Sequence, residues 1–320
     1  MGAGVVFAAV ASPKAEEGAT TRFGNFEILS RIGRGGMAEV SLARVLSGPR
    51  KGQEVALKRL LPDLAKNPQY VDLFCGEADL SRMLSHPNIV QVYEAGAAED
   101  TYYIAMERID GRDLGQILAR CRERRIVLPV DFALFLIHEL LQALAAAHTA
   151  TSPTGQFLNV VHCDVSPSNL FISRLGEVKL GDFGIAKVWA LDPSKRKGLW
   201  GKVHYASPEM LRGEMVLPQV DTWAAGVMLY ELLTLCRPFT GRKAEDIARE
   251  IVRADPIPIR DLRPEVPEAV ERVVSMALHP QPARRFADAA AFADALRPLY
   301  DDQIGTPLAI ASVVRGLFAA

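Results

Sequence analysis

The chain has 320 residues, of which 49% are hydrophobic and 23% charged, so it contains enough apolar material for a packed core. Its 37 Lys and Arg residues against 38 Asp and Glu residues give a formal net charge of −1, which argues against a general nucleic-acid binder, because such proteins carry a basic excess. The 24 Gly and 20 Pro residues are near ordinary usage and exclude collagen-like and low-complexity chains. The length predicts two domains or one two-lobed enzyme.

The cysteines and the apolar segments bear on the compartment. The four cysteines, at positions 75, 121, 163 and 236, show no C-x-x-C unit and no other spacing typical of a metal site. Scattered thiols in a chain of this size favour a reducing compartment, so we expect a cytoplasmic protein. The apolar segments 5–11 and 307–320 are too short to span a bilayer, and we expect no integral membrane segment.

In chain order, the first predicted elements are strands. Residues 1–25 are expected to be a flexible tail, because 12–25 are polar and lack an apolar period. Strand-like runs follow at 26–31, 38–46, 54–59, 89–95 and 102–108, with a helical stretch over 69–84 among them. We therefore expect residues 26–109 to form a small antiparallel β lobe with one main helix.

After Gly111 the apolar residues follow helical spacing. A long amphipathic helix is predicted over 132–148, and further helices over 220–235, 244–252, 266–278 and 287–300. Residues 110–299 are therefore expected to form a larger, mainly helical lobe, and the fold class is α+β. The tail 300–320 also has a helical period and could pack on this lobe or on a regulatory partner. Two unequal lobes leave a cleft, which is a preferred ligand site.

A glycine-rich loop, Ile32-Gly33-Arg34-Gly35-Gly36, lies between two predicted strands. Glycines let backbone N–H groups approach phosphate oxygens, although such a loop by itself can also be a plain turn. A dinucleotide-binding fold is excluded because a strand, not a helix, follows the glycines. A Walker A loop is excluded because no Gly-Lys-Ser/Thr follows.

A lysine inside an apolar strand sharpens this signal. Lys58 ends the run Val55-Ala56-Leu57-Lys58, and its ammonium needs a favourable partner because burying it unpaired is costly. Glu77 on the following helix is a natural partner. A glycine loop, a strand lysine and a helix glutamate in this order point to a phosphate-binding site.

Two loops of the second lobe carry oxygen ligands. The segment 161–169 contains Asp164 and Asn169, and the segment 180–184 is Leu-Gly-Asp-Phe-Gly with Asp182. Mg²⁺ prefers oxygen ligands and is usually held by few protein groups together with nucleotide phosphates. Two carboxylates and one amide suit one base and two metal ligands.

These motifs, in this order, resemble the protein-kinase family, specifically the bacterial eukaryotic-like (Hanks-type) serine/threonine kinases. The resemblance runs from about residue 26 to 299 and implies a bilobal fold with ATP between the lobes. It implies that Lys58 holds phosphates and pairs with Glu77, that Asp164 is the catalytic base, and that Asn169 and Asp182 bind Mg²⁺ or Mn²⁺. Its implied ATP-contacting residues are Ile32, Gly33, Gly35, Gly36, Val40, Ala56, Lys58, Met106, Glu107, Ile109 and Phe171.

The supporting frame follows the family as well. Ser207-Pro208-Glu209 stands where the family has Ala-Pro-Glu, and Arg285 is the expected buried partner of Glu209. Asp221 is expected to brace the backbone around His162. The resemblance thus implies an activation segment that small-molecule phosphotransferases lack, and therefore a protein substrate.

Two departures from the family pattern concern the glycine-rich loop and regulation. Ala38 replaces the third glycine of the loop and keeps a small side chain there. Cys163 replaces the arginine that receives an activation-loop phosphate, and Ser194 is the only Ser or Thr between 185 and 206. We therefore predict activity without activation-loop phosphorylation. Cys163 could be a redox switch or a packing residue.

Two further departures concern catalysis. Ser166 stands where these kinases carry a lysine that reaches the γ-phosphate, and this loss should cost several kcal/mol of transition-state stabilisation if nothing replaces it. Lys202 stands seven residues before Glu209, where the family has a threonine. We hypothesise that Lys202 is catalytic and supplies the missing charge; the alternative is a lysine that faces solvent.

Pro167 and the charges of the segment 185–206 bear on the substrate. Pro167 follows the serine/threonine form of the loop and favours Ser/Thr acceptors on proteins. The segment 185–206 carries Lys187, Lys195, Arg196, Lys197 and Lys202 against Asp192, which could favour acidic substrates or reflect a mobile solvated loop. The rivals are a pseudokinase that binds nucleotide as a switch or scaffold, for which Cys163, Ser166 and Ala38 speak, and a small-molecule kinase.

Overall fold

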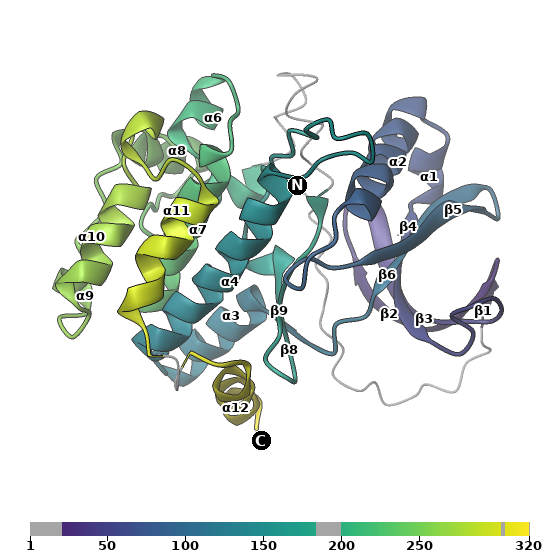
Figure 1. Ribbon diagram of the computed structural model, residues 1–320, viewed down its shortest axis with the longest axis horizontal. Coiled ribbons are helices and arrows are strands. Elements are labelled where there is room, and N and C mark those ends of the chain that lie inside the picture. The colour runs from purple at the N-terminus through teal and green to yellow at the C-terminus, as the bar shows by residue number, and fades with distance from the viewer. Residues whose placement is uncertain (1–20, 184–199, 302–304, 320) are drawn as a thin grey trace.

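The computed structural model describes residues 21–183, 200–301 and 305–319. Figure 1 shows two lobes: a curled sheet with two helices on the right, and a larger set of helices on the left. The predicted α+β, bilobal class is confirmed. Residues 185–199 of the predicted segment 185–206, with Ser194 and most of its basic residues, lie outside the described residues, as do residues 1–20.

The small lobe is a six-stranded antiparallel sheet in the order β1-β2-β3-β4-β6-β5. Its strands are β1 Thr21–Phe23, β2 Phe26–Arg34, β3 Ala38–Val45, β4 Glu54–Leu60, β5 Val92–Ala98 and β6 Thr101–Glu107. Phe23 and Phe26 are buried against Tyr103 at one end of the sheet. The sheet therefore begins at Thr21, inside the stretch 1–25 that was expected to be a flexible tail. The reason is that Phe23 packs against Tyr103 and is buried there.

The predicted strand 89–95 begins three residues later in the structure, at Val92. Ile89 and Val90 continue the apolar run, but their backbone pairs with the other lobe: Val90 N–H donates to Leu180 O at 2.9 Å, and Leu180 N–H donates to Asn88 O at 2.7 Å. This segment is therefore a backbone connection between the two lobes, and periodicity along the chain could not reveal it.

Two helices cover the small sheet: α1 Pro62–Ala65 and α2 Pro68–Met83. Helix α2 begins where predicted, because the Asn67 side chain accepts from Gln69 N–H and Pro68 occupies the first turn, where a missing N–H costs nothing. Its buried face includes Phe74, Glu77 and Leu80. The helix thus presents Glu77 toward the sheet.

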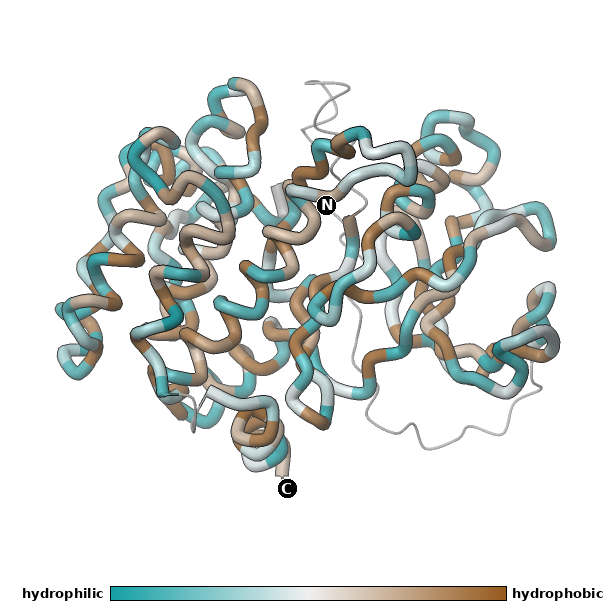
Figure 2. Tube along the Cα trace, viewed as in Figure 1, coloured by the Kyte–Doolittle hydropathy of each residue, from teal (hydrophilic) through white to brown (hydrophobic). Residues whose placement is uncertain are grey.

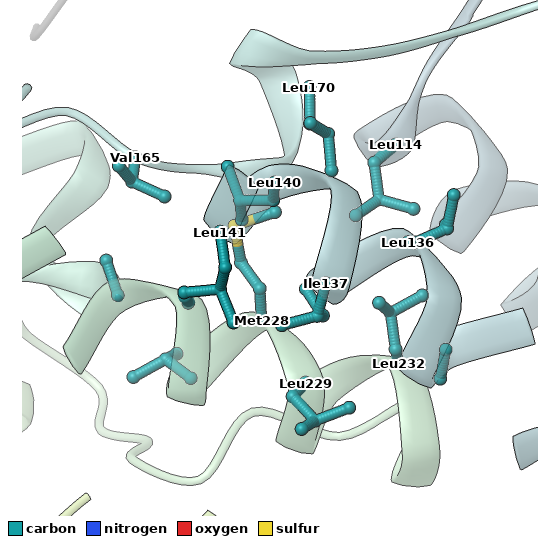
Figure 3. Packing of buried hydrophobic residues seen from close by; sticks show 14 of the residues in the cluster. Leu114, Leu136, Ile137, Leu140, Leu141, Val165, Leu170, Met228, Leu229 and Leu232 are labelled. Atoms are coloured by element: carbon teal, nitrogen blue, oxygen red, sulfur yellow. The ribbon is translucent and has the colours of Figure 1, made fainter. Parts of the chain in front are cut away.

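The large lobe is built around two long helices, α4 Val130–His148 and α7 Gln219–Thr234. Figure 3 shows Leu140 and Leu141 of α4 packed with Met228, Leu229 and Leu232 of α7. By length and apolar composition α4 could cross a bilayer, but most of it is buried within this core. Before residue 300, the other described helices of this lobe are α3 Leu114–Arg124, α6 Pro208–Arg212, α8 Ala244–Arg253, α9 Ile259–Leu262, α10 Glu268–Ala277 and α11 Ala289–Leu296. The described 3-10 turns are η1 Pro167–Asn169, η4 Trp200–Tyr205, η5 Pro282–Arg284 and η6 Arg297–Leu299.

A second, three-stranded sheet joins the lobes, with β7 Gly111–Asp113, β8 Leu170–Ser173 and β9 Val178–Leu180 in the order β7-β8-β9. Gly111 is required at its start because a Cβ there would lie 1.9 Å from Ile172 O. This close approach lets β7 run directly from the small lobe onto the strand that follows Asn169.

The C-terminal helix α12 Pro307–Phe318 packs on its own lobe, as one of the two predicted alternatives had it. Ile310, Val314 and Leu317 are buried, and Figure 2 shows hydrophobic positions of α12 in brown beside the helical lobe. Gly176 lets the β8–β9 turn approach this helix, since a Cβ would lie 1.7 Å from Pro307 O.

Candidate active site

Lys58 lies in the middle of β4, paired with Val40 of β3 on one side and Ile104 of β6 on the other. Its side chain is only 4% exposed, and its Nζ lies 2.5 Å from Glu77 Oε1 and 2.7 Å from Asp182 Oδ1. The structure thus joins strand, helix and loop at one ammonium group, and the predicted partner Glu77 is in place.

Electrostatics keep this lysine charged. Burial by itself lowers the pKa of Lys58, but the carboxylates of Asp182 and Glu77 outweigh it and raise the pKa above its ordinary value. One cation between two carboxylates leaves a net negative charge in a buried place, so a bound cation would be favourable here.

Asp164 and Asn169 are held together within the segment 161–169, here called the catalytic loop. Asn169 Nδ2 donates to Asp164 Oδ2 at 2.9 Å and to the Asp164 backbone carbonyl at 2.9 Å. The amide is oriented by these two bonds, so its oxygen Oδ1 points away from Asp164 and can serve as a ligand. Asp164 itself is buried, with its side chain 6% exposed.

The backbone around Asp164 is strained and braced. Cys163 has φ 61° and Asp182 has φ 63°, a left-handed conformation that non-glycine residues rarely adopt. The carboxylate of Asp221 accepts from His162 N–H at 2.8 Å and from Cys163 N–H at 2.9 Å. The predicted bracing role of Asp221 is confirmed, and His148 Nε2 lies 2.8 Å from the same carboxylate.

The loop with Asp182 is tied to the loop with Asn169. Gly181 N–H donates to Asn169 O at 3.0 Å, and the His162 ring Nε2 lies 3.0 Å from Gly181 O. The ring of Phe183 packs on the His162 ring with centroids 4.6 Å apart. These contacts bring the predicted metal ligands to one place.

The donor set of these two loops fits a hard divalent cation. Asn169 offers an amide oxygen, and Asp182 keeps a second carboxylate oxygen besides the one that contacts Lys58. Within the described residues there is no group of three or more His, Cys, Asp and Glu side chains that could enclose a metal alone. A Mg²⁺ ion here would therefore share its coordination with phosphate oxygens and water, as Mg²⁺ does elsewhere.

The residues predicted around adenine meet in one apolar cluster. Val40, Ala56, Met106 and Phe171 are buried in it, and Ile32 and Ile109 pack against it. Ala56 of β4 pairs with Leu42 of β3 on one side and with Met106 of β6 on the other. The cluster therefore lies at this level of the three strands. Glu107 N–H donates to Gln91 O at 2.8 Å and is therefore already used. The backbone carbonyl of Glu107 is the group left for the predicted contact with adenine.

The glycine-rich loop turns between β2 and β3. Gly33 pairs with Val40, and Gly35 N–H closes the turn on Ala38 O at 2.8 Å, with Gly36 exposed at the tip. Ala38 is fully buried in the apolar cluster instead of facing the loop tip, so its replacement of glycine serves packing.

Lys202, from the 3-10 segment η4, reaches the catalytic loop. Its Nζ lies 2.6 Å from Asp164 Oδ2 and 3.4 Å from Asn169 Oδ1, and its side chain is 20% exposed. The alternative of a lysine that faces solvent is therefore wrong. Ser166 is buried, and its hydroxyl donates to the Asp164 carbonyl at 3.3 Å. A serine carries no positive charge, so this position does not supply the missing cation.

The Cys163 thiol lies in an environment that keeps it protonated. Burial, together with the nearby carboxylates of Asp221 and Asp164, raises the pKa of Cys163 far above its ordinary value. A protonated thiol is a poor nucleophile, which favours packing over redox reactivity. The structure describes all four cysteines as free thiols.

The frame of the large lobe contains the predicted buried ion pair. Arg285 donates to Glu209 Oε1 at 2.7 Å and Oε2 at 2.8 Å, and its guanidinium stacks over the Trp223 ring at 4.7 Å. This two-bond geometry is strong and specific, and it anchors the end of the segment that carries Lys202.

The sequence analysis missed Asp113. This residue lies in β7 opposite Phe171, and its Oδ1 caps helix α3 by accepting from Gln116 N–H at 2.9 Å. Its other oxygen, Oδ2, is buried and has no hydrogen-bond partner among the described residues. Burial raises the pKa of Asp113 to about 6, against the lowering effect of nearby backbone N–H groups. An unpartnered buried oxygen beside the apolar cluster marks a place for a ligand hydroxyl.

Comparison with known proteins agrees with this geometry. The model of the protein kinase domain matches residues 26–296. The chain belongs to the protein kinase family. It is 39% identical over 283 residues to the tyrosine-protein kinase MasK of Myxococcus xanthus (88% of this chain, 44% of that protein) and 34% identical over 267 residues to the serine/threonine-protein kinase PrkC of Bacillus subtilis (83% and 39%).

The solved kinase domain of PknI from Mycobacterium tuberculosis has a similar fold, with a TM-score of 0.65 and 26% sequence identity over 89% of this chain and 99% of that one. The bacterial Hanks-type resemblance is therefore confirmed. The chain spans only 44% and 39% of the lengths of MasK and PrkC, so the comparison concerns their kinase domains.

Proposed function

We propose that this chain transfers the γ-phosphoryl group of ATP to hydroxyl groups of protein substrates. The observation that carries the proposal is the simultaneous presence of the Lys58–Glu77 ion pair, the Lys58–Asp182 contact and the Asp164–Asn169 hydrogen bond. In protein kinases the lysine–glutamate pair and the metal-binding aspartate must both be in place for transfer. A pure scaffold would have no need of the complete set.

In the proposed mechanism the phosphates lie between Lys58 and the N–H groups of the Gly33–Gly36 loop. Asp164 accepts the proton of the substrate hydroxyl as the hydroxyl oxygen attacks, and Asn169 keeps the carboxylate oriented. Asn169 and Asp182 would hold Mg²⁺, or Mn²⁺ in its place, which supplies positive charge next to the transferred group. The Val40, Ala56, Met106 and Phe171 cluster excludes water from the base-binding side.

Asp113 would contribute to nucleotide binding. Asp113 lies in β7, shortly after Ile109, and pairs with Phe171 of β8. Its Oδ2 is the buried oxygen that has no partner among the described residues. A ribose hydroxyl is the part of ATP that can donate to a carboxylate beside the adenine site. This contact would offset the cost of burying an unpaired carboxylate oxygen.

Lys202 would replace the lysine that Ser166 has displaced. The ammonium contacts the base Asp164 and lies near Asn169, so its charge is next to the place where phosphoryl transfer occurs. A preorganised cation there stabilises the developing charge of the transferred group.

Serine and threonine are the proposed acceptors. Pro167 in the loop and the names of several relatives, PrkC among them, support this choice. MasK is named a tyrosine-protein kinase, and at 39% identity it makes tyrosine the second candidate. Phosphoamino-acid analysis of the product decides between the two acceptors.

Phosphate transfer from labelled ATP with Mg²⁺ to acidic and basic test proteins, and to the kinase itself, is the direct test. We expect transfer by the wild-type chain and a loss of about 10³-fold in Asp164→Asn, because the base is removed while the nucleotide site stays. ATP binding should persist in the variant. Binding of ATP without any transfer by the wild type would favour the pseudokinase instead, and transfer to metabolites alone would favour a small-molecule kinase.

A further inference from the structure

Two arginines flank a buried glutamate close to the catalytic segment. Arg122 of α3 places Nη2 2.6 Å from Glu231 Oε1, and Arg237 places Nε 3.5 Å from the same oxygen. The hydroxyl of Tyr205 donates to the other oxygen at 2.6 Å. Glu231 is thereby satisfied on both oxygens while both guanidinium groups remain partly in solvent.

The charges of this group do not cancel. Glu231 is 1% exposed, whereas the side chains of Arg122 and Arg237 are each 40% exposed. Two cations share one carboxylate, so among the described residues one positive charge is left over at the surface. His204 adds no charge, because burial and the neighbouring Arg237 lower its pKa below the ordinary value.

The position of Arg122 is set by α3. Arg120 and Arg124, on either side of it, donate to carbonyls at the end of α12, Leu317 O and Ala319 O. Arg122 instead donates to Leu235 O at 2.9 Å and reaches Glu231 of α7. Of these three arginines, Arg122 is therefore the one that contacts α7 and the residue that follows it.

The group lies within reach of an acceptor at Asp164. Tyr205 is three residues after Lys202, where the 3-10 segment is kinked, so the Cα atoms of the two residues are at most about 11 Å apart. Lys202 contacts Asp164. Since an extended peptide advances about 3.3 Å per residue, a side chain within about four positions of the acceptor could reach the arginines.

We propose that Arg122 and Arg237 form a subsite for an acidic side chain of the protein substrate, within about four residues of the acceptor hydroxyl. The inference rests on the proposed kinase function and adds its substrate class. A carboxylate and a phosphate that is already present on the substrate would both suit two guanidinium groups. The arginines would attract the substrate and fix its register, while the chemical step stays with Asp164.

The test compares synthetic peptides that share one acceptor and carry, at each position from four before to four after it, Ala, Glu, Lys or phosphoserine. We expect kcat/KM for the best Glu peptide to exceed that for the Ala peptide by about five- to tenfold, chiefly through KM, and the Lys peptide to be poorer still. A larger gain for phosphoserine than for Glu would identify phosphorylated proteins as the substrates.

Arg237→Ala should remove most of this preference. Arg237 is the better variant because its contact with Glu231 is the longer one, whereas loss of Arg122 also removes a bond to Leu235 O. Arg237→Glu should reverse the order so that the Lys peptide becomes the better one. Arg272→Ala, a 66% exposed arginine on α10, is the matched control and should leave the preference unchanged.

The outcomes separate the two proposals. If no peptide is phosphorylated although ATP binds, the kinase function fails and the subsite is not at issue. If the Ala peptide is phosphorylated but Glu and phosphoserine bring no gain, or if Arg237→Ala keeps the full preference, the acidic subsite is wrong and the kinase function stands.

Discussion

The two lysines of the proposed active site have similar partners but different surroundings. Lys58 is 4% exposed and lies in a central strand between carboxylates from two other segments. Lys202 is 20% exposed and comes from a 3-10 segment with an irregular φ of −118° and ψ of 18°, and both its partners belong to the catalytic loop. Lys58 is therefore part of the fold and of the site, whereas Lys202 belongs to the site alone.

This difference predicts which free energies each lysine controls. Removal of Lys58 leaves Glu77 and Asp182 as buried acids without a cation, which costs stability as well as phosphate binding. Removal of Lys202 leaves Asp164 still bonded to Asn169 and nearer to solvent. Its loss should reduce turnover with little effect on folding.

The largest effect is expected from Lys58→Met. We expect a loss of about 10³-fold in kcat/KM, weaker ATP binding, and a decrease of about 3–5 kcal/mol in the free energy of unfolding. Steady-state kinetics, nucleotide titration and urea unfolding measure the three quantities. Lys51→Met, an exposed lysine of the same lobe, should change none of them. An unchanged unfolding midpoint in Lys58→Met would contradict the structural half of the comparison.

The next effect is expected from Lys202→Ala. We expect turnover to fall by about 10²-fold because a cation beside the transferred group is lost, while the dissociation constant of ATP and the unfolding midpoint change little. The sharper variant moves the charge: Ser166→Lys combined with Lys202→Thr should recover part of the activity that Lys202→Ala loses. Normal turnover in Lys202→Ala, or no recovery in the double variant, would show that Lys202 is dispensable or acts by structure alone.

A smaller effect, of opposite sign for stability, is expected from Asp113→Asn. The folded pKa of Asp113 is raised to about 6, so its ionised form is disfavoured in the fold and wild-type stability decreases as pH rises from 4 through 6. Asn can still cap α3, so the variant should gain on the order of 2 kcal/mol at pH 7. This gain should vanish below pH 4, where the wild-type carboxyl is protonated in both states.

The same variant should bind ATP less well, by up to about tenfold, because an amide oxygen accepts a ribose hydroxyl less strongly than a carboxylate does. Thermal unfolding across pH and nucleotide titration give the two readouts. Asp288→Asn is the matched control, since Asp288 caps α11 from an exposed position and should show neither effect. A variant with higher stability and unchanged ATP affinity would remove Asp113 from the nucleotide site.

The smallest effect is expected from Ser194→Ala, which should keep activity within about twofold of the wild type. With Cys163 in place of the arginine that would receive a phosphate, phosphorylation of the segment has no charge partner in the catalytic loop. Kinase assays before and after phosphatase treatment check this. A collapse of activity in either experiment would mean that phosphorylation is needed after all.

Local patterns determined the elements that the sequence analysis found. Helix α4 and helix α7 were predicted to within two residues because their apolar positions recur at helical spacing. The predicted helix 287–300 is shorter in the structure, since Pro298 cannot donate to the α-helical ladder and the last turn becomes the 3-10 turn η6. Helix α3 was missed although Asp113 is a typical N-cap and Leu114, Ile117, Leu118 and Cys121 follow helical spacing.

By itself, the sequence determined which residues are proposed for the catalytic set, because their order and types are a chemical requirement that can be seen along the chain. Only the tertiary structure decided which of them touch. Lys202 meets Asp164 across 38 residues, and Arg122 meets Glu231 across 109, so no local period could encode these contacts. They arise from the packing of whole helices and loops, which also buries Asp113 Oδ2 with no partner in the part of the chain that the structure describes. Spacing along the chain determines which residues share one face of a helix or strand. The distances between charged side chains depend instead on which of these faces pack together.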